Sequence, residues 1–196
     1  GFLRRQSDDF AHVGVNQLLH DLEHLVRVHP SLLDNEFHVT PLARDIGVKI
    51  NGTDLIQMLL NLIINGFQCA PLAHRVEVGG EILSAPLDLT ELKDGANDWL
   101  LNVEGLDNAA PLVKLWVRDN GSGILPEVLP KIFQPYFTTK GPRQGTGLGL
   151  NIVQRLVKEA NGALHVRTRV GEGTTFTIYL PGARLETAAD ENYSIA

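Results

Sequence analysis

The feature that most constrains the fold is the segment 120–146, which is rich in glycine and proline and has neither helical nor strand periodicity. It lies between a predicted apolar strand over 112–119 and a predicted amphipathic helix over 148–161. A loop of this length inside a compact domain is usually functional. We therefore expect the chemistry to lie where this segment meets the sheet and the helix.

Helices and strands alternate along the rest of the chain. One helix is predicted over 17–26, with Asn16 as its N-cap and Pro30 as its stop. A second is predicted from a cap at Thr53 or Asp54 to about residue 70. Strands are predicted over 36–42, 47–51, 76–83, 112–119, 164–170 and 174–180. The expected fold is an α/β two-layer sandwich, with a mixed sheet of about five strands and about three helices on one face.

The chain divides into one domain and two flanking pieces. Residues 1–12 are interpreted as the end of an upstream linker or helix, 13–182 as the domain, and 183–196 as a disordered tail. Within the domain, the acidic segment 84–111 is interpreted as an inserted loop or hairpin, mostly solvated, around an apolar piece at 99–101. The absence of an initial methionine indicates a piece of a longer protein.

Composition excludes several classes of function. The formal net charge is −6, so the chain lacks the surplus of cations that nucleic-acid binding requires. No run of about 18 apolar residues is present, so no transmembrane helix is expected. A single cysteine, Cys69, excludes an internal disulfide and fits a reducing compartment. A cytoplasmic location is expected, whether or not a parent protein is anchored in a membrane.

The predicted helix over 53–70 carries amides on one face. Asn61 and Asn65 are four residues apart and project from the same side, flanked by Gln57 and Gln68. Buried amides need partners, and an amide oxygen is a hard ligand suited to Mg²⁺ held together with phosphates. The alternative is a polar stripe satisfied by caps or water.

A second motif, Asp119-Asn120-Gly121-Ser122-Gly123, directly follows the predicted strand 112–119. An ionised Asp only accepts hydrogen bonds, so it suits the exocyclic amine of adenine and not the carbonyl of guanine. The glycines allow the backbone to approach a flat ring. The alternative is an ordinary turn.

A third motif, Gly145-Thr146-Gly147-Leu148-Gly149-Leu150, opens the predicted helix 148–161. Free amides and the positive end of the helix dipole favour anions there. The motif is neither a P-loop nor a Rossmann fingerprint, because no Gly-Lys-Ser/Thr follows it and no strand precedes it. By itself, a glycine-rich helix start leaves the ligand open.

Taken in order, the motifs resemble the GHKL ATPase/kinase superfamily, and within it the sensor histidine kinases. Asn61–Asn65 resembles the N box, Asp119–Ile124 the G1 box, 132–140 the F box, Gly145–Leu150 the G2 box, and Gly171–Phe176 the closing hairpin. The Thr-Thr-Lys end of the F box is most similar to the nitrogen-regulation type of kinase. The resemblance covers about residues 14–181.

The resemblance implies the Bergerat fold, with ATP held between helices under a flexible lid at 125–144. It implies that Asn65 ligates Mg²⁺, that Asn61 lies beside the phosphates, and that Asp119 reads adenine. The remaining implied nucleotide-binding residues are Gly121, Gly123, Lys140, Gly145, Thr146, Gly147, Leu148, Gly149 and Thr174. Asn61 and Lys140 are the candidate catalytic residues, with Arg143 a weaker candidate for neutralising phosphate charge.

One position separates kinases from hydrolases. Superfamily hydrolases carry a general-base Glu where this chain has Asn61, and an amide cannot take that proton. The expected function is therefore phosphoryl transfer from ATP to a histidine on an upstream dimerisation domain, with a receiver domain of a response regulator downstream and a homodimeric parent. A serine kinase of the anti-sigma type and a non-catalytic ATP-binding module remain alternatives. Gln68 and Cys69 depart from the family, which often has Lys or Arg and an aromatic there.

Overall fold

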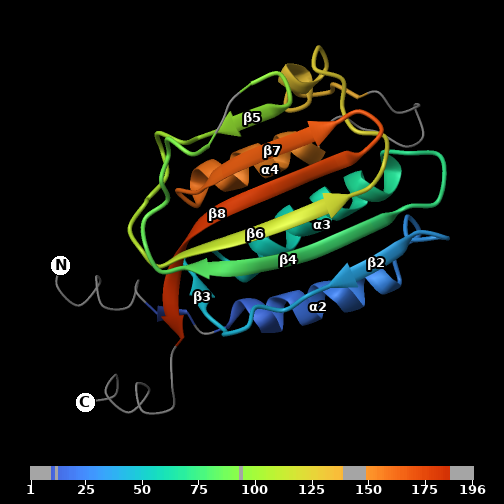
Figure 1. Cartoon of the computed structure of the whole chain (residues 1–196). Helices are drawn as coiled ribbons and strands as arrows, with labels where there is room; N and C mark the ends of the chain where they lie inside the picture. Colours follow the sequence, from blue (N-terminus) through green and yellow to red (C-terminus); the bar gives the residue numbers. More distant parts are fainter. Residues whose placement is uncertain (1–9, 12, 93–94, 139–148, 186–196) are drawn as a thin grey trace, which may run out of the picture.

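The computed structural model describes residues 10–11, 13–92, 95–138 and 149–185, which form a sheet with helices packed on one face (Figure 1). The helices are α2 (Val15–Arg27), α3 (Gly52–Gln68) and α4 (Gly149–Glu159), together with a short 3-10 helix at Leu129–Lys131. The strands are β1 (Phe10–Ala11), β2 (Glu36–Val39), β3 (Gly47–Val48), β4 (Arg75–Leu83), β5 (Asp98–Leu101), β6 (Leu112–Asp119), β7 (Ala163–Arg169) and β8 (Gly173–Leu185).

The main path of the sheet runs β2-β4-β6-β8-β7-β5. β2 and β4 pair in parallel, and the other neighbours in this path are antiparallel. The two-residue strands β1 and β3 pair with the far end of β8. The predicted two-layer α/β sandwich is confirmed. It has more strands than the five or so expected, because β1 and β5 lie in segments that were predicted as a linker and an inserted loop or hairpin.

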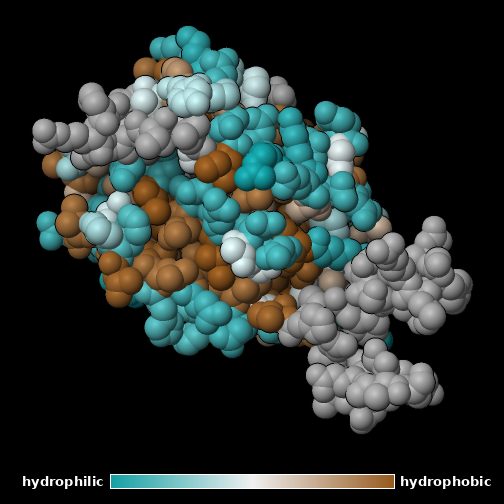
Figure 2. Space-filling model, turned by 180° about the vertical axis from the view of Figure 1, so that it is seen from behind, coloured by the Kyte–Doolittle hydropathy of each residue, from teal (hydrophilic) through white to brown (hydrophobic). Residues whose placement is uncertain are grey.

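The core lies between the sheet and the helices. α3 presents Leu55, Leu59, Leu62 and Ile63 at helical spacing, and each is at most 1% exposed. Such aliphatic side chains each contribute about 1.5–3 kcal/mol of burial free energy. Figure 2 shows the helical side of the molecule, where apolar surface gathers in the middle and hydrophilic surface surrounds it.

The alternation of β6 determines the position of Asp119. Val113, Leu115 and Val117 face the helices and are buried, while Arg118 faces outward. Because side chains alternate along a strand, Asp119 continues the inward row and is only 5% exposed. The carboxylate therefore enters the layer between sheet and helices at the end of the strand.

Both predicted helix caps were wrong. Gly14 is the N-cap of α2, because the amide of Asn16 donates to Oδ1 of Asp45 and the Asn16 side chain bonds the backbone of Leu42. Asn51 caps α3 by accepting from the Thr53 amide at 2.8 Å.

Three boundaries also differ from prediction. β8 runs through Pro181 to Leu185, since the Pro181 carbonyl accepts from Lys49 at 3.1 Å, so 183–185 is strand and not tail. Residues 10–11 are strand β1 rather than part of a helix. Segment 84–111 contains β5, which joins the sheet beside β7. Within the described residues, no helix has the length and apolar character needed to cross a bilayer.

Candidate functional site

A cleft of about 1380 Å³ opens beside the C-terminal half of α3. Pockets for small molecules usually measure about 300–1,000 Å³, so this one has room for a nucleotide. Its lining combines α3, the start of α4, the loop after β6 and the α2–β2 loop. The predicted residues that line it are Asn61, Asn65, Gly123 and Gly149.

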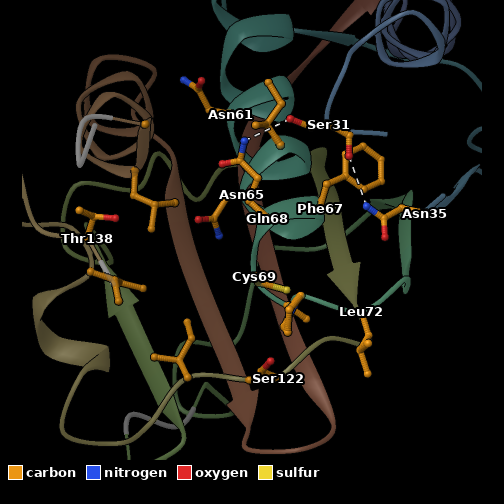
Figure 3. A pocket seen from close by; sticks show the side chains of 18 of the residues that line it. Ser31, Asn35, Asn61, Asn65, Phe67, Gln68, Cys69, Leu72, Ser122 and Thr138 are labelled. Atoms are coloured by element: carbon orange, nitrogen blue, oxygen red, sulfur yellow. Dashed lines mark hydrogen bonds between the residues drawn. The ribbon is translucent and has the colours of Figure 1, made fainter. Parts of the chain in front are cut away.

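The amides of α3 differ in their surroundings. Among the described side chains, Nδ2 of Asn61 is a buried polar atom with no hydrogen-bond partner. Figure 3 shows Asn61 and Asn65 on the same side of α3, while Gln68 turns toward the α2–β2 loop. There Nε2 of Gln68 donates to Oγ of Ser31 at 3.1 Å. Since an unmade buried bond costs about 1–3 kcal/mol, Asn61 is prepared to donate to a ligand acceptor.

Asp119 lies behind Cys69 at the other end of the cleft. Oδ1 accepts from the Gly121 amide at 3.0 Å and from the Cys69 thiol at 3.3 Å. Burial raises the pKa of Asp119 above its ordinary value, and the hydrogen bonds from Gly121 and Cys69 oppose that rise without cancelling it. Asp119 and Gly121 are not among the lining residues, and the sulfur of Cys69, which does line the cleft, lies close to both.

The loop after β6 is held against the β7–β8 turn. Gly123 has φ of +73°, and a Cβ there would lie 2.2 Å from the carbonyl oxygen of Arg169. The amide of Ile124 donates to Oγ1 of Thr168, which also bonds Oγ1 of Thr174 at 2.9 Å. The hydroxyl of Thr174 thus faces this buried contact, and Thr174 is the register partner of Asp119 across β6 and β8.

The F-box segment packs back onto the helical layer. Phe133 is 5% exposed, and its carbonyl accepts from Nδ2 of Asn151 on α4 at 3.3 Å. Thr138 lines the cleft. The remaining predicted residues, Lys140, Arg143, Gly145, Thr146, Gly147 and Leu148, lie outside the described residues, so their roles stay predictions.

Sequence reasoning missed two features of the cleft. Its wall extends to the α2–β2 loop, including His29 and Ser31, which belong to none of the sequence motifs. His74 contacts both Cys69 and the last turn of α3, although it belongs to none of the boxes. Within the described lining there is no lysine or arginine, so this part of the cleft offers amides, backbone and the α4 terminus to an anion.

Three comparisons place this geometry among known proteins. The family model for histidine kinase-, DNA gyrase B- and HSP90-like ATPases matches residues 50–184. Sensor kinase CckA of Brucella abortus (strain 2308) is 35% identical over 161 residues, covering 76% of this chain and 16% of that protein. Sensor histidine kinase ZraS of Salmonella typhimurium is 33% identical over 144 residues, covering 67% of this chain and 30% of that protein. The chain thus spans less than a third of either relative.

Solved structures show the same fold. The mycobacterial sensor histidine kinase MprB aligns with a TM-score of 0.62 at 24% identity, over 88% of this chain and 97% of that one. The family match covers the amide-bearing helix, the Asp119 loop and the β7–β8 hairpin together. On this match, with the cleft in the expected place, the chain belongs to the family of histidine kinase-, DNA gyrase B- and HSP90-like ATPases.

Proposed function

We propose that this chain is the catalytic domain of a sensor histidine kinase, which binds Mg·ATP in the cleft and presents the γ-phosphate to a histidine on an upstream dimerisation domain. The observation that carries the proposal is the pair of α3 amides, Asn61 and Asn65, which line one cleft together with Cys69, the neighbour of the buried Asp119. The family membership supports ATP as the ligand, and the two curated relatives are sensor kinases.

Each end of the cleft suits one end of the nucleotide. Asp119 is an acceptor for the exocyclic amine of adenine and disfavours guanine, which presents a carbonyl there. The unsatisfied Nδ2 of Asn61 suits a phosphate oxygen. The amide oxygen of Asn65 is a ligand type that Mg²⁺ accepts, and that ion would offset phosphate charge where the described lining offers no lysine or arginine. Lys140 is proposed to add a further positive charge on lid closure.

The chemistry at Asn61 favours transfer over hydrolysis. A general base must take a proton from the attacking water, and an amide does not do so near neutral pH. No carboxylate is among the described lining residues except Asp34, which belongs to the α2–β2 loop and not to α3. A nucleophile brought by another domain, such as an imidazole, needs no such base. A homodimeric parent, a receiver-domain partner and a cytoplasmic location belong to the same proposal.

Calorimetric titration of the chain with ATP and GTP, with and without Mg²⁺, tests the binding half. We expect ATP to bind, Mg²⁺ to strengthen it, and GTP to bind far more weakly. The transfer half is tested by adding the upstream histidine-containing domain in trans with γ-labelled ATP, and by its His→Ala variant as control. Binding without transfer would instead support a nucleotide-binding regulatory module.

A further inference from the structure

The buried carboxylate of Asp119 has support from outside the G1 box. Cys69, at the end of α3, places its sulfur 3.3 Å from Oδ1 of Asp119. His74, in the α3–β4 loop, places Nε2 3.6 Å from the same sulfur. Figure 3 shows the Cys69 sulfur near the middle of the cleft wall, between Asn65 and Ser122. These contacts line up an imidazole, a thiol and a carboxylate.

The hydrogen bonds of His74 indicate which groups donate. Its Nδ1 faces the carbonyl oxygen of Leu72 at 2.8 Å, and its Nε2 faces the carbonyl oxygen of Gly66. Carbonyl oxygens only accept, so both contacts are satisfied together only when both ring nitrogens carry protons. Both ring nitrogens are thus placed as donors, and the charge interaction with His74 acts to lower the pKa of Asp119.

The thiol has two acceptors within reach. The Gly66 carbonyl lies 3.0 Å from the sulfur but also accepts from His74, while Oδ1 of Asp119 bears the negative charge. Hydrogen bonds to ionised acceptors are about twice as strong as neutral ones, so the S–H proton favours the carboxylate. The Nε2–H of His74 is taken up by the Gly66 carbonyl and lies 3.6 Å from the sulfur, so His74 occupies the competing acceptor and leaves the S–H proton to Asp119.

We propose that Cys69 and His74 are positioning residues that orient Asp119 and hold it ionised for base recognition, an inference that rests on the proposed nucleotide-binding function. The Gly121 amide and the Cys69 thiol occupy two of about four acceptor positions on the carboxylate, which leaves capacity for an exocyclic amine. On the flanking strands, the register partners of Asp119 are Val76 and Thr174, which carry no charge. Among the described residues, Cys69 and His74 are the titratable groups whose hydrogen bond and charge act on it.

The first experiment needs no nucleotide. Cys69 is the single cysteine, so alkylation of the chain by iodoacetamide reports on this thiol alone. A carboxylate that holds the S–H proton slows thiolate formation, and a nearby imidazolium speeds it. We expect Asp119→Asn to accelerate alkylation severalfold and His74→Gln to slow it, whereas His38→Gln, an exposed control paired with Glu36, leaves it unchanged. An unchanged rate in both test variants overturns the proposal.

The second experiment measures ADP affinity against pH. Only ionised Asp119 accepts from the base, so affinity falls as pH drops through its pKa. Cys69→Ala removes a donor and should move this acid limb to higher pH, with a loss of about three- to tenfold at neutral pH, the size of one ordinary net hydrogen bond. Cys69→Ser keeps a donor and should restore most of the loss. His74→Gln should also move the limb upward.

The outcomes separate the two proposals. If the wild-type chain binds no adenine nucleotide, or if Asp119→Asn binds as well as wild type, the proposed function fails while the alkylation rates still decide whether the thiol is coupled to Asp119. If ADP binds and Asp119→Asn loses it, but Cys69→Ala and Cys69→Ser share one pH profile with wild type, the positioning role is overturned and the proposed function stands.

Discussion

Oδ1 of Asp119 lies 3.0 Å from the backbone nitrogen of Gly121, so the carboxylate fixes the turn that follows its own strand. Any acceptor at this position, charged or neutral, can accept the hydrogen bond from the Gly121 amide and so hold the turn. The negative charge matters for ligand binding, because a carboxylate offers only acceptors to the base, whereas a neutral amide in the same place can turn a donor toward it. Loss of this charge is therefore expected to stabilise the ligand-free chain and to weaken nucleotide binding.

Asp119→Asn should weaken ATP binding and reduce its preference over GTP while stabilising the ligand-free chain near neutral pH. Burial raises the pKa of Asp119 above its ordinary value. A carboxyl with a raised folded-state pKa contributes stability below its unfolded value, and that contribution is lost as pH rises through the folded value. The gain in thermal midpoint should therefore shrink as pH falls toward 4. Thermal melts between pH 4 and 8 check this, and a destabilised variant at pH 7 would contradict it.

Asn61→Ala should separate ligand affinity from stability. Removing an unsatisfied buried donor should leave ligand-free stability unchanged or raise it by about 1 kcal/mol. Loss of a phosphate contact should lower Mg·ATP affinity by about tenfold. Gln57→Ala, an exposed amide on the same helix, is the matched control and should change neither quantity. Equal effects of the two variants on calorimetric affinity would remove Asn61 from the binding site.

Gly123→Ala should be strongly destabilising. The new Cβ would meet the Arg169 carbonyl at 2.2 Å and would also require a positive φ. Gly171→Ala is the matched control, because Gly171 also has a positive φ, +82°, but open space around it. The control should lose about 1 kcal/mol for backbone strain and Gly123→Ala clearly more. Urea unfolding of both variants checks this; equal losses would mean that the loop relaxes away from Arg169.

Asp98→Asn should loosen β5 from the sheet. Burial alone would raise the pKa of Asp98, but hydrogen bonds from Arg167 at 3.0 Å and His165 at 2.8 Å outweigh it and lower the pKa. A lowered folded-state pKa gives stability above the unfolded value that is lost as pH falls through the folded one. Hydrogen exchange at pH 7 should therefore speed up in β5 of the variant and stay constant in β6.

Glu104→Gln, an exposed acid in the same segment, serves as the control and should leave β5 protected. Acidification of the wild-type chain to below pH 4 should reproduce the loosening seen in Asp98→Asn. If β5 exchanges at the same rate in both variants, the contacts of Asp98 do not hold this strand.

The sequence predicted the parts of the fold that have a clear period. β6 was expected at its observed bounds, because Val113, Leu115 and Val117 alternate with polar residues and Asp119 ends the run. β5 was assigned to a solvated insertion because its partner, β7, lies more than sixty residues away in the chain. Pairing between strands so far apart in the chain leaves no pattern in the sequence of either strand.

The candidate site likewise contains residues that the sequence predicted and residues that it did not. Asn61, Asn65 and Gly123 were predicted because they belong to motifs whose spacing can be read from the sequence, and they line the cleft. His74 was not found, because its importance comes from contacts with Gly66, Leu72 and Cys69 that only the folded chain creates. A histidine in a loop looks the same in sequence whether it is solvated or supports a buried carboxylate.

The long strand β8 also separates the end of the sheet that holds β1 from the end that holds Asp119. Thr174, near its start, pairs with Asp119, while Arg184 and Leu185, at its end, pair with Phe10 and Ala11 of β1 (Figure 1). At about 3.3 Å per residue, these two ends lie on the order of 30 Å apart. Under the proposed function, a phosphate acceptor on a domain that precedes β1 would join this domain at the end remote from Asp119. The orientation of the two domains would then control how often the acceptor and the nucleotide meet.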